Sequence, residues 1–214
     1  MGSKGTYLFG TGGSGMTFLK RKFGWVNKEP ESWQHFRYLN KDCNGFRVDV
    51  PSDAKIVYLF AHPFDTMLSF ERRGFLESYD MAVANLQGDY EKYRKLKITS
   101  LKEYLSHGND LFMFGHHFNT FYNLPNRVMF IKYESLGENM KLLSRWANVS
   151  VDSDEPFIDR NSDFTKCDCN TLRGLIDIHG AWADHYNSLP DYFTNKGSKK
   201  YEFNNKTKFD YLYN

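Results

Sequence analysis

Eight residues near the amino terminus, Gly10 to Thr17, have the spacing of a phosphate-binding loop. Gly10 and Gly15 stand five positions apart, and Thr17 follows the second glycine by two. In such a loop the backbone N–H groups wrap a phosphate, and the start of the following helix favours negative charge. Met16 occupies the place where an ATPase or kinase needs lysine. We therefore expect the loop to bind a phosphate without cleaving ATP in the usual way; the alternative is a Gly-rich turn that only joins a strand to a helix.

The segments around the loop alternate between strand and helix. A β-favouring run over 6–9 precedes the loop, and a helix is predicted over 16–25 because Met16, Leu19 and Phe23 share one helical face. Apolar runs predict further strands over 46–50, 55–61 and 127–133, and helical spacing predicts helices over 65–79, 81–96, 101–104, 111–122, 142–147 and 172–186. This order implies βαβ units, and hence a three-layer α/β fold with a mostly parallel sheet flanked by helices.

The length and composition predict one folded domain over residues 1–214. The aromatic fraction of 17% supplies a sizeable core. The formal net charge is only +2, which gives non-specific nucleic-acid binding no overall electrostatic support. No signal peptide or membrane-length apolar run is present, so we expect a soluble cytoplasmic protein without a membrane span. We expect the basic segment 195–214 to be flexible.

The cysteines raise the alternative of a metal site. Cys167 and Cys169, with His179 and His185 downstream, could act as zinc ligands, but one intervening residue is tighter than the usual spacing. Three cysteines also make an odd count for a disulfide framework and agree with a reducing compartment. We therefore predict no metal.

Four segments resemble the sulfotransferase family, P-loop-type proteins that transfer a sulfuryl group from 3′-phosphoadenylyl sulfate (PAPS) to a hydroxyl or amine. Residues 12–17, Gly-Gly-Ser-Gly-Met-Thr, resemble the family's 5′-phosphosulfate loop, commonly Pro-Lys-Ser-Gly-Thr-Thr. Residues 55–69 resemble the 3′-phosphate segment, in which a strand leads into Arg-Asn-Pro-x-Asp and a serine follows four residues after the Asp. Residues 130–136 resemble a strand ending in Tyr-Glu-Asp-Leu, and residues 47–51 stand where the family often has Lys-x-His-x-Pro. The matches cover residues 6 to about 146, roughly two thirds of the chain.

The resemblance implies a sulfotransferase-like fold and a role for each matching position. PAPS would be the co-substrate, bound without a metal in the crevice at the carboxyl ends of the strands. Asp49 would take the proton of an unidentified acceptor, a small molecule or a glycan, and Arg47 would orient that acceptor. Ser69 and Arg73 would approach the 3′-phosphate, and Tyr133 would lie near the adenine. The contacts to the 5′-phosphosulfate would come from Gly12, Gly13, Ser14, Gly15, Met16 and Thr17.

Two positions depart from the family pattern. Gly13 stands where the family has the loop Lys or Arg, and Ala61 stands where it has the Arg that grips the 3′-phosphate. A preorganised cation stabilises the charge of a transfer reaction, so its loss weakens catalysis. Other basic residues are candidate substitutes: Lys20, Arg21, Arg72, Arg73 and the lysines of the C-terminal segment 195–214. The alternative function is a catalytically degenerate binding or structural protein of the same fold, and a nucleotide or nucleoside kinase is a third.

Three histidines near the expected site have open roles. His62 replaces the family's Asn, and either shapes a turn or contacts an anion. His116 and His117 fall in a predicted helix, where adjacent residues point about 100° apart. At most one of these two is therefore expected to face a pocket.

Overall fold

The computed structural model describes residues 5–23, 33–34, 49–77, 93, 95–150, 157 and 162–195. Three predictions fall wholly or mostly outside these ranges. They are the strand over 46–50, of which only the last two residues are described, most of the helix over 81–96, and the flexible segment 195–214 beyond its first residue. Arg47 also lies outside the described residues.

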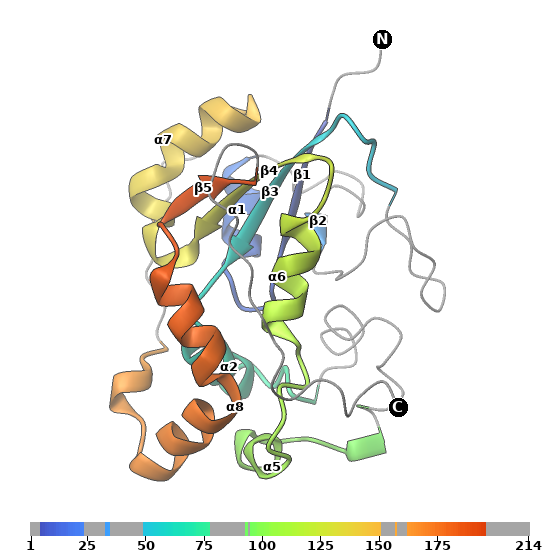
Figure 1. The fold of residues 1–214 in the computed structure, drawn as a ribbon. Helices are drawn as coiled ribbons and strands as arrows, with labels where there is room; N and C mark the ends of the chain where they lie inside the picture. The colour runs from blue at the N-terminus through green and yellow to red at the C-terminus, as the bar shows by residue number, and fades with distance from the viewer. Residues whose placement is uncertain are drawn as a thin grey trace.

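The described strands form one open sheet in the order β2-β1-β3-β4-β5 (Figure 1). β1 (Thr6–Gly10), β2 (Trp33–Gln34), β3 (Lys55–Phe60) and β4 (Arg127–Lys132) are parallel, whereas β5 (Tyr192–Thr194) pairs antiparallel with β4. The predictions over 6–9, 55–61 and 127–133 are confirmed. Their nearly continuous apolar runs are typical of strands buried on both faces. The short edge strands β2 and β5 were not predicted from the sequence.

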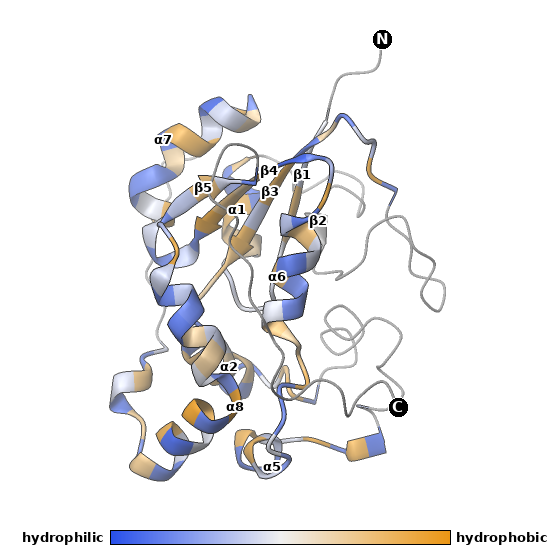
Figure 2. Cartoon of the chain, in the orientation of Figure 1, coloured by the Kyte–Doolittle hydropathy of each residue, from blue (hydrophilic) through white to orange (hydrophobic). Residues whose placement is uncertain are grey.

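The two faces of the sheet carry two separate cores, so the fold has three layers. Alternate residues of β3 point to opposite faces. Tyr58 and Phe60 join an aromatic core beneath α2 (Pro63–Arg72), α6 (Phe114–Tyr122) and α8 (Cys169–Ser188). Val57 and Leu59 join an aliphatic core beneath α1 (Met16–Lys22) and α7 (Leu136–Ala147). Figure 2 shows the resulting concentration of apolar residues along the strands. The prediction of a mostly parallel sheet flanked by helices is confirmed.

The helix boundaries differ from the predictions where a backbone feature intervenes. α2 ends at Arg72 rather than reaching 79, because Gly74 follows with a φ of +67° and turns the chain. α6 begins at Phe114 rather than 111, because the Asp110 carboxylate accepts hydrogen bonds from the N–H groups of residues 112–114. α5 (Leu101–Ser106) and α8 extend the predicted segments 101–104 and 172–186 by a few residues.

Buried histidines pair with tyrosines inside the aromatic core. His117 is fully buried, and its Nδ1 lies 2.7 Å from the Tyr58 hydroxyl. His117 therefore faces the core rather than a pocket, and His116 is half-buried. His179 Nε2 lies 3.1 Å from the Tyr104 hydroxyl, which is also in the core. No group of three metal-ligand side chains occurs among the described residues.

His179 should make the free energy of unfolding fall as the pH is lowered. Burial holds the pKa of His179 below its ordinary value of 6.5, so the native imidazole is neutral. The unfolded chain takes up a proton first as the pH falls, and stability is therefore full above about pH 6.5 and declines below it. Urea unfolding at about pH 7.5 and about pH 5.5 should show a smaller loss on acidification in His179→Gln than in the wild type. The exposed His107→Gln is the control, and an equal loss in all three proteins would contradict the prediction.

Candidate functional site

The Gly-rich loop leaves β1 at the carboxyl edge of the sheet and leads directly into α1. Gly10 lies against β3 so closely that a Cβ there would overlap the Leu59 carbonyl oxygen. Gly13 and Gly15 have φ angles of +74° and +81°, which side-chain-bearing residues rarely adopt. The three glycines are thus required by the path of the backbone, a feature expected of a loop whose backbone approaches a ligand.

Ser14 holds the loop in shape from inside. Its N–H and its Oγ donate to the carbonyl oxygen of Thr11, at 3.3 Å and 2.5 Å. Both donors of Ser14, including the N–H that the resemblance assigns to the 5′-phosphosulfate, are therefore used within the loop, and Ser14 is buried. Thr17, in the first turn of α1, is exposed, and that turn contains no acidic residue. The outer part of the loop can thus present N–H groups to an anion without a competing carboxylate in that turn.

The loop contacts two other segments that were expected to share its ligand. A Cβ at Gly15 would overlap the ring of Tyr133, which immediately follows β4. A Cβ at Gly13 would lie 3.3 Å from Phe70 Cε1 and 3.4 Å from Thr66 Cγ2, both on α2. The structure therefore brings the loop, α2 and Tyr133 together.

The residues expected at the 3′-phosphate, Ser69 and Arg73, are respectively buried and at the end of a helix. Ser69 is 3% exposed, in the interior of α2. Arg73 is exposed at the carboxyl end of α2, where its guanidinium lies 5.6 Å from the Phe75 ring. The basic residues of α1 likewise occupy its last turn, away from the loop: Lys20, Arg21 and Lys22. Both helices therefore carry these cations at their carboxyl ends.

Asp49 lies at the opposite edge of the sheet from the loop. Two residues later, the Pro51 carbonyl accepts a hydrogen bond of 2.9 Å from the side chain of Asn126, which precedes β4. Because β1, β3 and β4 are parallel, this anchors the segment to the amino edge (cyan in Figure 1). The length of β3 separates the two edges by about 17 Å, at about 3.3 Å per residue. The structure does not bring the expected base to the loop.

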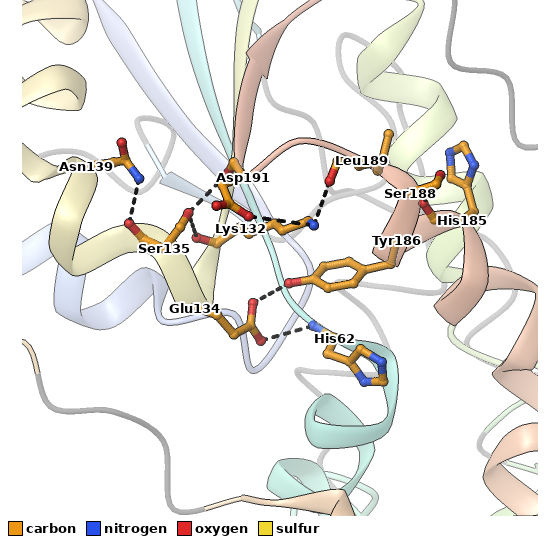
Figure 3. Close-up of polar contacts among 10 residues, drawn as sticks. All are labelled: His62, Lys132, Glu134, Ser135, Asn139, His185, Tyr186, Ser188, Leu189 and Asp191. Carbon is orange, nitrogen blue, oxygen red and sulfur yellow. Dashed lines mark hydrogen bonds and ion pairs between the residues drawn. The ribbon is translucent and has the colours of Figure 1, made fainter.

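A polar cluster joins the carboxyl ends of β3 and β4 to α8 (Figure 3). The Glu134 carboxylate accepts hydrogen bonds from the His62 N–H at 3.3 Å and from the Tyr186 hydroxyl. The Lys132 ammonium donates to the Leu189 carbonyl at 2.7 Å and lies 4.7 Å from the centre of the Tyr186 ring. Burial lowers the pKa of Lys132, and the nearby carboxylates of Asp191 and Glu134 partly oppose this.

Lys132, Glu134 and Tyr186 were not predicted as site residues from the sequence. The indication for Lys132 was its place after the apolar residues 128–131 of β4, since a buried lysine needs partners. His62, whose role was open, begins α2, and its ring stacks on Phe164 at 4.6 Å. His62 therefore stands at the N-cap position of α2, and its ring packs against an aromatic neighbour.

Comparisons of the chain with protein-family models, with curated proteins and with solved structures find no match. Within the part of the chain that the structure describes, no helix is long and apolar enough to cross a membrane.

Replacing Gly15 with alanine should destabilise the protein more than the same replacement at a left-handed glycine elsewhere in the chain. Gly15→Ala should lower the free energy of unfolding by roughly 3 kcal/mol, since left-handed strain of about 1–2 kcal/mol adds to overpacking against Tyr133 of about 1–3 kcal/mol. Gly74→Ala is the matched control, because Gly74 has a φ of +67° and open space around it. Denaturant unfolding of both variants measures the difference. Equal losses would show that the contact between Gly15 and Tyr133 does not constrain the loop.

Proposed function

We propose that the Gly-rich loop binds the 5′-phosphosulfate of PAPS, and that the chain transfers a sulfuryl group to a hydroxyl or amine acceptor. The observation that carries the proposal is the contact of the loop with both Tyr133 and α2 at the carboxyl edge of the sheet. The resemblance assigns these three segments to one nucleotide. In open α/β sheets, ligands bind at this edge.

The donors around the loop fit a phosphate or sulfate group held mainly by backbone N–H groups. Gly13 and Gly15 add no side chain to the loop, and the first turn of α1 adds its own N–H groups. Tyr133 would border the nucleotide where it contacts Gly15. When bound, PAPS would supply the sulfuryl group. Asp49 is not proposed as the base, because it lies at the amino edge.

Binding without turnover is the second candidate, and the placement of Asp49 favours it. The position that would hold the family's loop cation is Gly13, whose left-handed φ disfavours any side chain. Ala61, at the other missing cation, is 4% exposed. A protein that keeps the anion-binding loop but lacks both cations would bind the nucleotide and transfer its sulfuryl group slowly or not at all.

Thermal unfolding with three ligands tests the proposal. A ligand at about 100 times its Kd should stabilise the native protein by roughly 2.7 kcal/mol. PAPS and adenosine 3′,5′-bisphosphate should raise the Tm of the wild type and of Gly74→Ala, but not that of Gly15→Ala. ATP with magnesium should have a smaller effect, because Met16 replaces the lysine that holds the β- and γ-phosphates.

The outcomes separate the candidates. Release of sulfuryl groups from bound PAPS to an acceptor supports transfer, whereas stabilisation without release supports binding alone. The absence of a Tm shift with either 3′-phosphorylated nucleotide would contradict the proposed ligand. Magnesium-dependent ATP consumption would instead support a kinase.

A further inference from the structure

Thr66 carries a buried hydroxyl that is not paired within the part of the chain that the structure describes. The residue lies on α2 and is 1% exposed. Its Oγ1 has no hydrogen-bond partner among the described residues. A buried hydroxyl without a partner destabilises a protein, so such a group is usually paired with protein, water or a ligand.

Thr120 shows how a helical threonine is ordinarily satisfied in this chain. It lies on α6, and its Oγ1 donates to the carbonyl oxygen of His116, four residues earlier, at 3.0 Å. The equivalent acceptor for Thr66 is the His62 carbonyl, which accepts the Thr66 N–H at 3.0 Å but no hydrogen bond from the Thr66 Oγ1. Thr66 does not make the side-chain bond that Thr120 makes. The hydrogen bond that a helical threonine ordinarily makes to its own helix therefore does not account for the Thr66 hydroxyl.

The Thr66 side chain packs directly against the part of the loop that lacks a side chain. Its methyl carbon, Cγ2, lies 3.4 Å from the point where a Cβ of Gly13 would stand. Gly13 itself is partly exposed. Threonine side chains occupy staggered rotamers, and a rotation about the Cα–Cβ bond can bring the hydroxyl to the position that the methyl now occupies. In the rotated position, the hydroxyl would face the backbone of the loop at Gly13.

We propose that Thr66 donates a hydrogen bond to an oxyanion, phosphate or sulfate, that the Gly-rich loop binds beside Gly13. This inference rests on the proposed function, since it assumes that the loop binds an anion. Anion binding would be accompanied by the rotation of Thr66, which exchanges an unpaired buried hydroxyl for a charge-assisted hydrogen bond. Thr66 would thus supply a neutral donor at the place where the loop has no cationic side chain.

Thr66→Val separates a binding role from a packing role, because valine keeps the shape and removes the hydroxyl. Without ligand, the variant should be as stable as the wild type or more stable, since it loses an unpaired polar group. Its Kd for adenosine 3′,5′-bisphosphate, measured by calorimetry, should rise about tenfold, the effect expected when one hydrogen bond to a charged group is lost. Thr66→Ser retains the hydroxyl and should bind within about threefold of the wild type.

Thr120→Val is the matched control. It removes a paired hydroxyl on another helix, so it should lower the Tm and leave the Kd unchanged. Titrations with inorganic sulfate and with inorganic phosphate show whether the donor serves the anion itself or requires the nucleoside.

Two results would overturn the role of Thr66. One is an unchanged Kd in Thr66→Val while the wild type binds, which would make Thr66 a packing residue and leave the proposed function intact. The other is a fall in the Tm of ligand-free Thr66→Val as large as that of Thr120→Val, which would mean that the hydroxyl is already paired. If the wild type binds none of the probes, the proposed function fails, and the role of Thr66 fails with it.

Discussion

The closeness of the Gly-rich loop to its neighbours is the constraint on which the candidate site depends. The backbone at Gly10 touches the carbonyl of Leu59, and Gly15 touches the ring of Tyr133. A side chain at either position would push the loop away from the sheet. Because β1, β3 and β4 are parallel, the residues that follow all three strands meet at one edge. The loop, the start of α2 and Tyr133 can therefore act on one ligand.

Two kinds of contact hold that edge in place. One is the core formed by aromatic side chains of β3, α6 and α8, in which the Tyr58 hydroxyl is hydrogen-bonded to His117 Nδ1. The other is the pair of hydrogen bonds by which the Glu134 carboxylate links the start of α2 to Tyr186 of α8. Close packing makes such an arrangement resist deformation, because moving one member forfeits the contacts of the others. The loop thus rests on a support built from segments far apart in the sequence.

Most of the sheet could be predicted from the sequence, because β1, β3 and β4 are apolar runs bounded by Gly, Pro or polar residues. The loop was also predictable, since its glycines fall between a strand and a helix. The early end of α2 was indicated by Gly74, but the apolar residues beyond it, Phe75 and Leu76, suggested a longer helix. A local pattern carries most information about elements that are buried along their whole length.

The rest of the site depends on contacts that no local pattern encodes. Glu134 and Tyr186 are 52 positions apart, so their hydrogen bond follows from the packing of α8 against the sheet. Asp49 matched a family motif by its place in the sequence, yet the hydrogen bond between Asn126 and Pro51 fixes its segment at the other edge. Thr66 gave no indication in the sequence, because only the folded structure reveals that its hydroxyl is buried without a hydrogen-bond partner among the described residues.

The central claim, that the loop binds the phosphosulfate end of a nucleotide, is tested most directly by following backbone amide resonances during titration with adenosine 3′,5′-bisphosphate. The expected result is saturable shifts concentrated in residues 10–17 and at Tyr133, with Asn126 at the opposite edge unaffected. Shifts concentrated around Asn126, or no saturable shift in the loop, would contradict the claim.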